Sequence, residues 1–174
     1  VELMKQNKYL YRETTIGKDK IIRGVEKLNF RFMPINIEYV QEISSWNYKG
    51  FIEEVVMTPY FESFKKDKEL KGPGGCDGFV ALLNNEVAGL FEFTVRDNIM
   101  EIGLALKPNL VGKGLGEKYV KQGIEFGVQY YDINIDSIRL VVDQKNQAAI
   151  RVYEKVGFTK VEQQENEFEM RMIL

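Results

Sequence analysis

The stretch that most constrains the fold is residues 104–117, which read LALKPNLVGKGLGE. An apolar run breaks at Pro108, three glycines follow at positions 112, 114 and 116, and apolar residues then recur at helical spacing. This order predicts a strand, a glycine loop and a helix. Glycines leave the backbone N–H groups of the loop uncovered, and the positive end of the following helix dipole points at them. The stretch therefore predicts a loop that binds phosphate oxygens.

Spacing excludes two other phosphate-binding loops. A Walker A loop needs a lysine followed by a hydroxyl residue for magnesium, but Lys113 is followed by Gly114. A dinucleotide fingerprint needs G-x-G-x-x-G, and the sixth position counted from Gly112 is Glu117. A carboxylate cannot replace the glycine that packs the helix against the strand. The loop is therefore expected to serve a different phosphate ligand.

The elements around the loop predict one α/β domain with a mixed sheet. Upstream, three apolar runs are joined by short Asn-containing turns, which favours antiparallel hairpins. Downstream, a stripe that includes Gly123 and Gly127 predicts a helix packed closely on the sheet. We expect strands at 79–83, 87–95, 99–106, 137–143, 158–161 and 168–173, and a helix from Asn146 to Gly157.

The N-terminal half is less regular. Residues 1–26 are charge-rich and aromatic and are interpreted as an extension, either a hairpin or an arm. Residues 28–32 alternate as a strand ended by Pro34, and Asn36 is a helix cap for a helix with Tyr39, Ile43 and Trp46 on one face. Residues 48–70, broken at Thr58-Pro59, fit two short amphipathic helices or an aromatic, acidic wall of a substrate cleft, and 71–75 form a loop.

Composition limits the chemistry and the partners. A chain of 174 residues with 44% hydrophobic content fits a single compact domain, and a net charge of −2 argues against a nucleic-acid partner. A single cysteine excludes an internal disulfide, and neither a secretory segment nor a membrane-spanning run is evident, so we expect a cytoplasmic protein with no membrane contact. Because there is no histidine, chemistry has to use Tyr, Asp, Glu, backbone amides or a cofactor, and no metal site is expected.

Two segments together resemble the GNAT superfamily of acyl-CoA-dependent N-acetyltransferases. Residues 106–116 read LKPNLVGKGLG, and residues 146–158 read NQAAIRVYEKVGF. The family loop is usually written Arg/Gln-x-x-Gly-x-Gly/Ala. Gly114 and Gly116 occupy its glycine positions, whereas Val111 stands where the family has Arg or Gln. The departure at Val111 removes a side-chain contribution but leaves the backbone donors in place.

The resemblance covers residues 28 to 174 and implies the fold. Residues 31–34 together with 46–48 are similar to the branch that includes ribosomal-protein and aminoglycoside acetyltransferases. The implied fold is a mostly antiparallel mixed sheet with helices on both faces. It splays between the strand ending at Leu106 and the strand ending at Asp143, with acetyl-CoA inserted in the splay. The domain organisation expected is therefore an extension at 1–26 and an N-acetyltransferase domain at 27–174.

The resemblance also implies the cofactor-binding residues. Backbone groups of Ala105 and Leu106 would pair with the pantetheine arm, as an exposed strand edge pairs with another strand. Lys113 either meets a phosphate or is merely solvated, and Asn146 both caps its helix and faces the cofactor. The implied set is Ala105, Leu106, Val111, Gly112, Lys113, Gly114, Leu115, Gly116, Glu117, Asn146 and Tyr153.

Three groups are candidates for catalysis. Tyr153 lies two helical turns, about 10 Å, beyond Asn146 on the same face, so both can touch one extended ligand. Its phenol would protonate a leaving thiolate of pKa about 8.5, although a core aromatic residue would show the same pattern. Family analogy gives the Leu106 N–H as the oxyanion donor. The general base is Glu101 by that analogy, with Glu92 as the alternative.

The expected function is acetyl transfer from acetyl-CoA to a primary amine by direct attack. The acceptor remains open between a protein N-terminus, an aminoglycoside and another small amine such as a polyamine. The alternative is a catalytically inactive acyl-CoA-binding regulatory module of the same fold. We also leave open a homodimer.

Overall fold

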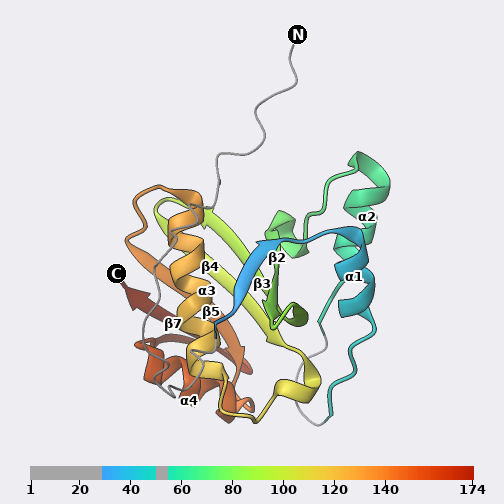
Figure 1. The fold of residues 1–174 in the computed structure, drawn as a ribbon. Coiled ribbons are helices and arrows are strands. Elements are labelled where there is room, and N and C mark those ends of the chain that lie inside the picture. The colour runs from blue at the N-terminus through green and yellow to red at the C-terminus, as the bar shows by residue number, and fades with distance from the viewer. Residues whose placement is uncertain (1–28, 50–54) are drawn as a thin grey trace, which may run out of the picture.

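The computed structural model describes residues 29–49 and 55–174, so the extension predicted at residues 1–26 lies outside the described residues. A seven-stranded sheet has the order β1-β2-β3-β4-β5-β7-β6 (Figure 1). The strands are β1 (Arg31–Pro34), β2 (Asp77–Leu83), β3 (Glu86–Arg96), β4 (Ile99–Leu106), β5 (Ser137–Asp143), β6 (Thr159–Gln164) and β7 (Glu167–Ile173). The helices are α1 (Ile37–Ser44), α2 (Thr58–Asp67), α3 (Gly116–Tyr131) and α4 (Gln147–Val156), with short 3-10 turns η1 (Pro73–Gly75) and η2 (Pro108–Leu110).

Strands β2, β3 and β4 form the predicted antiparallel meander. Two-residue turns join them, at Asn84-Asn85 and at Asp97-Asn98, and all four turn residues have φ between +50° and +65°. Asn and Asp tolerate this left-handed region, which is what the tight hairpin turn requires. The turn residues therefore fix the register that delivers β4 to the centre of the sheet.

The sheet opens between β4 and β5. These two strands run parallel and are paired only over residues 99–101 and 137–139. Beyond that point β4 continues to Leu106 and β5 continues to Asp143 without a ladder between them. The splay implied by the resemblance is thus present, and it separates the carboxyl ends of the two strands.

Two hydrophobic clusters hold the helices on opposite faces of the sheet. Helices α3 and α4 pack on one face, and α1 and α2 pack on the other (Figure 1). The close approach predicted for α3 is confirmed, because a Cβ at Gly123 would lie 2.1 Å from the Phe91 ring and one at Gly127 would lie 2.5 Å from the Phe93 ring. Both glycines allow the helix backbone to rest directly on aromatic rings of β3.

The N-terminal half differs in detail from the sequence predictions. The strand predicted from residue 28 begins only at Arg31, and it ends at Pro34 as predicted; an edge strand tolerates this proline because β1 pairs only with β2. Asn36 caps α1 as predicted, since its side chain accepts the Tyr39 N–H at 2.8 Å, but the helix ends before Trp46. Thr58 is the first residue of α2 rather than its cap.

Of the two helices predicted over 48–70, the structure confirms the second as α2. Residues 48–49 and 55–57 are not helical, and residues 50–54 lie outside the described residues. The loop predicted at 71–75 contains η1 and one isolated bridge, between Lys71 and Asp77. Among the described residues, no helix is both long and apolar enough to cross a membrane.

Candidate active site

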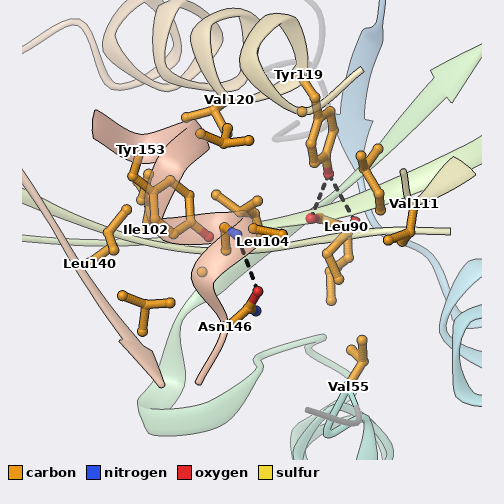
Figure 2. A pocket seen from close by; sticks show the side chains of 18 of the residues that line it. Val55, Leu90, Ile102, Leu104, Val111, Tyr119, Val120, Leu140, Asn146 and Tyr153 are labelled. Atoms are coloured by element: carbon orange, nitrogen blue, oxygen red, sulfur yellow. Dashed lines mark hydrogen bonds between the residues drawn. The ribbon is translucent and has the colours of Figure 1, made fainter. Parts of the chain in front are cut away.

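A pocket of about 610 Å³ lies where β4 and β5 separate (Figure 2). Its wall is formed by β4, the carboxyl-terminal part of β5, the glycine loop, the first turns of α3, the first two turns of α4 and the inner part of β3. The structure brings nine of the predicted site residues into this one wall. They are Ala105, Leu106, Val111, Gly112, Gly114, Leu115, Gly116, Asn146 and Tyr153.

The β4 edge offers backbone groups to the pocket. The Lys107 N–H donates to Ala88 O at 2.8 Å, and hydrogen-bonded pairs alternate along an antiparallel ladder. The N–H groups of Leu104 and Leu106 therefore point away from β3, toward β5. Because the β4–β5 ladder stops at residue 101, both amides face the splay. This edge can pair with a ligand that carries amides of its own.

The glycine loop places the N-terminus of α3 beside the same edge. Gly112 and Gly114 have φ of +77° and +76°, the left-handed region that glycine adopts without strain. The helix begins at Gly116, and its N-cap residue Leu115 makes no side-chain cap hydrogen bond. Within residues 29–49 and 55–174, no side chain hydrogen-bonds the first-turn N–H groups of α3, and the helix dipole favours an anion there.

Three of the predicted residues in the loop segment differ in their position relative to the pocket. Val111 lines the pocket and is 39% exposed as a residue, so an apolar group stands where the family pattern has Arg or Gln. Lys113 and Glu117 are not part of the pocket wall. The Glu117 carboxylate is instead paired with Lys121 at 2.8 Å, one helical turn further along α3.

The α4 side of the pocket is formed by Asn146 and Tyr153. The Asn146 side chain accepts the Ala149 N–H at 3.1 Å, so it caps α4 and lines the pocket at the same time. Tyr153 is buried and packs edge-on against Phe158, with ring centroids 5.9 Å apart. Figure 2 shows its hydroxyl directed into the pocket. Tyr153 is therefore both a core aromatic residue and a pocket residue.

The two candidate bases are placed in different surroundings. Glu101 lies where β4 is still paired with β5, outside the pocket wall, and its carboxylate is ion-paired with Arg139. Glu92 lies in the pocket wall, two residues closer to the splay because it pairs with Gly103. A Cβ at Gly103 would lie only 2.9 Å from the Glu92 Oε2, so this glycine makes room for the carboxylate.

Burial sets the protonation behaviour of Glu92. Burial raises the pKa of its carboxyl above the usual value, and hydrogen bonds from Tyr60 and Cys76 partly oppose that rise. The Tyr60 hydroxyl donates to Glu92 Oε1 at 2.7 Å from α2. A carboxylate held in this way can accept a proton from a ligand while its orientation stays fixed.

Sequence reasoning missed three tyrosines that complete the site. Tyr60 holds Glu92, Tyr48 donates a hydrogen bond to Leu106 O at 2.6 Å, and Tyr119 is fully buried beneath the β4 edge. Two signals were available: Tyr119 lies in the first turn after the glycine loop, and Tyr48 and Tyr60 lie in the segment 48–70, for which an aromatic wall of a substrate cleft was one interpretation. Within the described residues, no group of three or more His, Cys, Asp or Glu side chains is placed to hold a metal ion.

Comparisons with known proteins agree with this geometry. Residues 38–158 match the model of the acetyltransferase (GNAT) family. The chain is 31% identical over 84 residues to the spermidine N(1)-acetyltransferase of Escherichia coli (strain K12), a match that covers 47% of this chain and 44% of that protein. The chain thus spans less than half the length of the curated relatives it matches.

Solved structures share the fold at low sequence identity. A chimera of the Vibrio cholerae spermidine N-acetyltransferase SpeG and hSSAT has a TM-score of 0.66 at 17% identity, covering 83% of this chain and 95% of the chimera. The Campylobacter jejuni N-acetyltransferase PseH in complex with acetyl coenzyme A has a TM-score of 0.63 at 17% identity, covering 83% and 99%. With the family match extending over more than half of its residues, the chain belongs to the GNAT acetyltransferase family.

Proposed function

We propose that this protein transfers an acetyl group from acetyl-CoA to a primary amine. The observation that carries the proposal is the pocket at the splay. It joins an unpaired strand edge, an uncapped helix N-terminus, a buried phenol and a buried carboxylate in one cavity. Acetyl-CoA, when bound, supplies the acetyl group as a thioester. The C. jejuni relative in complex with acetyl coenzyme A supports the choice of this co-substrate.

The chain offers a separate surface for each part of that co-substrate. The Leu104 N–H suits the amide-bearing pantetheine, because it faces the splay beyond the end of the β4–β5 ladder, and the Leu106 N–H, which faces the same way, is left for the acetyl group. The N–H groups of the loop and of the α3 N-terminus, residues 111–117, suit the pyrophosphate. Asn146, at the start of α4, lines the same pocket. Binding through backbone groups is compatible with valine at position 111.

Three groups then act on the reacting atoms. Glu92 takes a proton from the substrate ammonium, so that the neutral amine can attack the thioester carbonyl, and its position in the pocket wall favours it over Glu101. The Leu106 N–H donates to the acetyl oxygen as negative charge develops there, a contribution of about 3 kcal/mol in reactions of this type. Tyr153 gives its proton to the departing thiolate, and the resulting phenolate recovers a proton as the nitrogen of the tetrahedral intermediate loses one to become the amide. These roles require no covalent enzyme intermediate.

The acceptor is proposed to be a small amine or a free protein N-terminus. Similarity to spermidine acetyltransferases makes polyamines the first compounds to test. The test is release of CoA thiol from acetyl-CoA in the presence of spermidine, spermine, an aminoglycoside and a peptide with a free N-terminus, with the mass of each product. We expect one acceptor to accelerate thiol release and to gain an acetyl group. Acetyl-CoA binding with no acceleration by any amine would favour the regulatory-module alternative.

A further inference from the structure

We infer that Tyr48 and Tyr119 are positioning residues that hold the two peptide groups on either side of Leu106 and so aim the Leu106 N–H at the acetyl oxygen. The inference rests on the proposed function, since it assigns a task to residues that the proposed chemistry does not touch. Neither hydroxyl exchanges a proton in the reaction. Each contacts the backbone from a different face of the sheet.

Tyr119 acts on the peptide group that precedes Leu106. Its hydroxyl lies 2.6 Å from Leu90 O and 3.2 Å from Ala105 O (Figure 2). The Ala105 carbonyl and the Leu106 N–H belong to the same planar peptide group, so a contact to one end restricts the direction of the other. The phenol has one hydrogen, which the two carbonyl oxygens share with the shorter contact at Leu90 O, so its effect on the Ala105 peptide is to fix the position of that carbonyl.

Gly89 makes this contact possible. A Cβ at position 89 would lie 2.3 Å from the Tyr119 hydroxyl oxygen and 2.8 Å from Ala105 O. Gly89 pairs with Leu106 across the β3–β4 ladder. The glycine therefore leaves a space in β3 that the phenol fills from α3, directly opposite the residue whose amide faces the pocket.

Tyr48 acts on the peptide group that follows Leu106. Its hydroxyl donates to Leu106 O at 2.6 Å, and the Lys107 N–H at the other end of that peptide donates to Ala88 O at 2.8 Å. The Lys107 side chain is paired with Glu42 of α1 at 2.9 Å. The end of β4 is thus held from the α1 side as well as by Tyr119 from α3.

The two hydroxyls compensate for the hydrogen bonds that the end of β4 does not make with β5. In a complete sheet β5 would hold residues 102–106, but the splay leaves that edge open for a ligand. A free edge can rotate its peptide planes, and an error of about 1 Å at a reacting centre can cost about a hundredfold in rate. Tyrosine hydroxyls on both neighbouring peptides restore the rigidity, and because Tyr48 binds Leu106 O, the Leu104 and Leu106 N–H groups still face the splay.

The test uses Tyr119→Phe and Tyr48→Phe, which remove the hydroxyl and keep the ring, with Tyr131→Phe as the matched control. The Tyr131 hydroxyl donates to Asp77 Oδ2 at 2.7 Å and lies outside the pocket wall. The readouts are kcat, the dissociation constant of acetyl-CoA, and the infrared stretching frequency of the thioester carbonyl in bound acetyl-CoA labelled with ¹³C at that carbon. Thermal unfolding establishes that each variant is folded.

We expect each of the two pocket variants to lose about tenfold in kcat, with the acetyl-CoA dissociation constant changed less than about twofold. The bound carbonyl frequency should move toward its value in free acetyl-CoA, because the N–H donor is less well aimed. Tyr131→Phe should change neither quantity. Gly89→Ala in the otherwise unmodified protein should lower kcat as Tyr119→Phe does, because the added methyl group displaces the Tyr119 hydroxyl.

Unchanged kcat and carbonyl frequency in a folded Tyr48→Phe or Tyr119→Phe variant would overturn the inference while leaving the proposed function intact. If Tyr119→Phe does not fold, Tyr48→Phe decides alone, because Tyr48 is half-exposed and lies outside the main core cluster. Absence of transfer to any amine by the unmodified protein would instead count against the proposed function.

Discussion

At the scale of single residues, the position of a carboxylate along its strand decides whether it can act on a ligand. Glu92 and Glu101 lie on the same face of neighbouring strands, but Glu92 pairs with Gly103 at the splay and Glu101 pairs with Thr94 before it. The two pairs are only two residues apart along β4, yet Glu92 lines the pocket and Glu101 forms an ion pair with Arg139. Sequence alternation gives the face of each residue, whereas the point where β4 leaves β5 depends on long-range pairing.

Glu92→Gln is expected to lower kcat by about a hundredfold or more, because the amide cannot accept the proton of the attacking amine. Since burial raises the pKa of Glu92, the wild-type rate should rise with pH across a range that begins above the usual glutamate value, as the carboxyl loses its proton. The variant should lose this rise. Glu101→Gln is the control and should keep both the rate and the pH profile.

Tyr153→Phe should lower kcat strongly while acetyl-CoA affinity changes little, because the ring still packs on Phe158 and only the acidic proton is lost. The measurement is steady-state kinetics together with equilibrium binding of acetyl-CoA. Full activity with an unaltered pH–rate profile would remove Tyr153 from the acid role. Tyr131→Phe again provides the comparison for loss of a phenol outside the pocket.

At the scale of elements, two glycines do different work in the loop and in the helix that follows. Gly114 needs its left-handed φ of +76°, and a Cβ there would meet nothing within 4 Å. Gly123 needs the space, because a Cβ there would lie 2.1 Å from Phe91. The sequence predicted both elements, since the glycine spacing and the helical stripe are local signals.

Gly114→Val should weaken acetyl-CoA binding by about tenfold or more, because the β-branched residue disfavours the φ that aims the loop amides at a phosphate. Gly75→Val is the matched control. Gly75 also has a positive φ, of +82°, with nothing within 4 Å of a Cβ, but it does not line the pocket. Equal acetyl-CoA affinity in the folded Gly114→Val variant and the wild type would contradict the phosphate assignment.

Gly123→Ala should lower the free energy of unfolding by about 1–3 kcal/mol, because the new methyl forces α3 away from Phe91. Alanine has the higher helix propensity, so a stabilised variant would show that the packing argument is wrong. Urea denaturation measures the difference. Glu125→Ala, at an exposed position of the same helix, should change stability little.

At the scale of the whole molecule, local sequence patterns predict the individual helices and strands, whereas the order of the strands in the sheet depends on long-range pairing. The meander, α3, β5 and α4 follow from alternation, turn residues and capping, and they were predicted close to their observed bounds. The insertion of β7 between β5 and β6 was not predicted, because strand order depends on contacts between segments far apart in the chain. The roles of Tyr48, Tyr60 and Tyr119 escaped prediction for the same reason.

The account's central claim is that acetyl-CoA occupies the place where β4 leaves β5. The measurement that tests it most directly is amide hydrogen exchange at single residues of β4, with and without acetyl-CoA. The Leu104 and Leu106 amides should exchange more slowly when acetyl-CoA is bound, whereas the Met100 amide, already within the β4–β5 ladder, should not change. Bound acetyl-CoA that leaves exchange at Leu104 and Leu106 unaltered would contradict the claim.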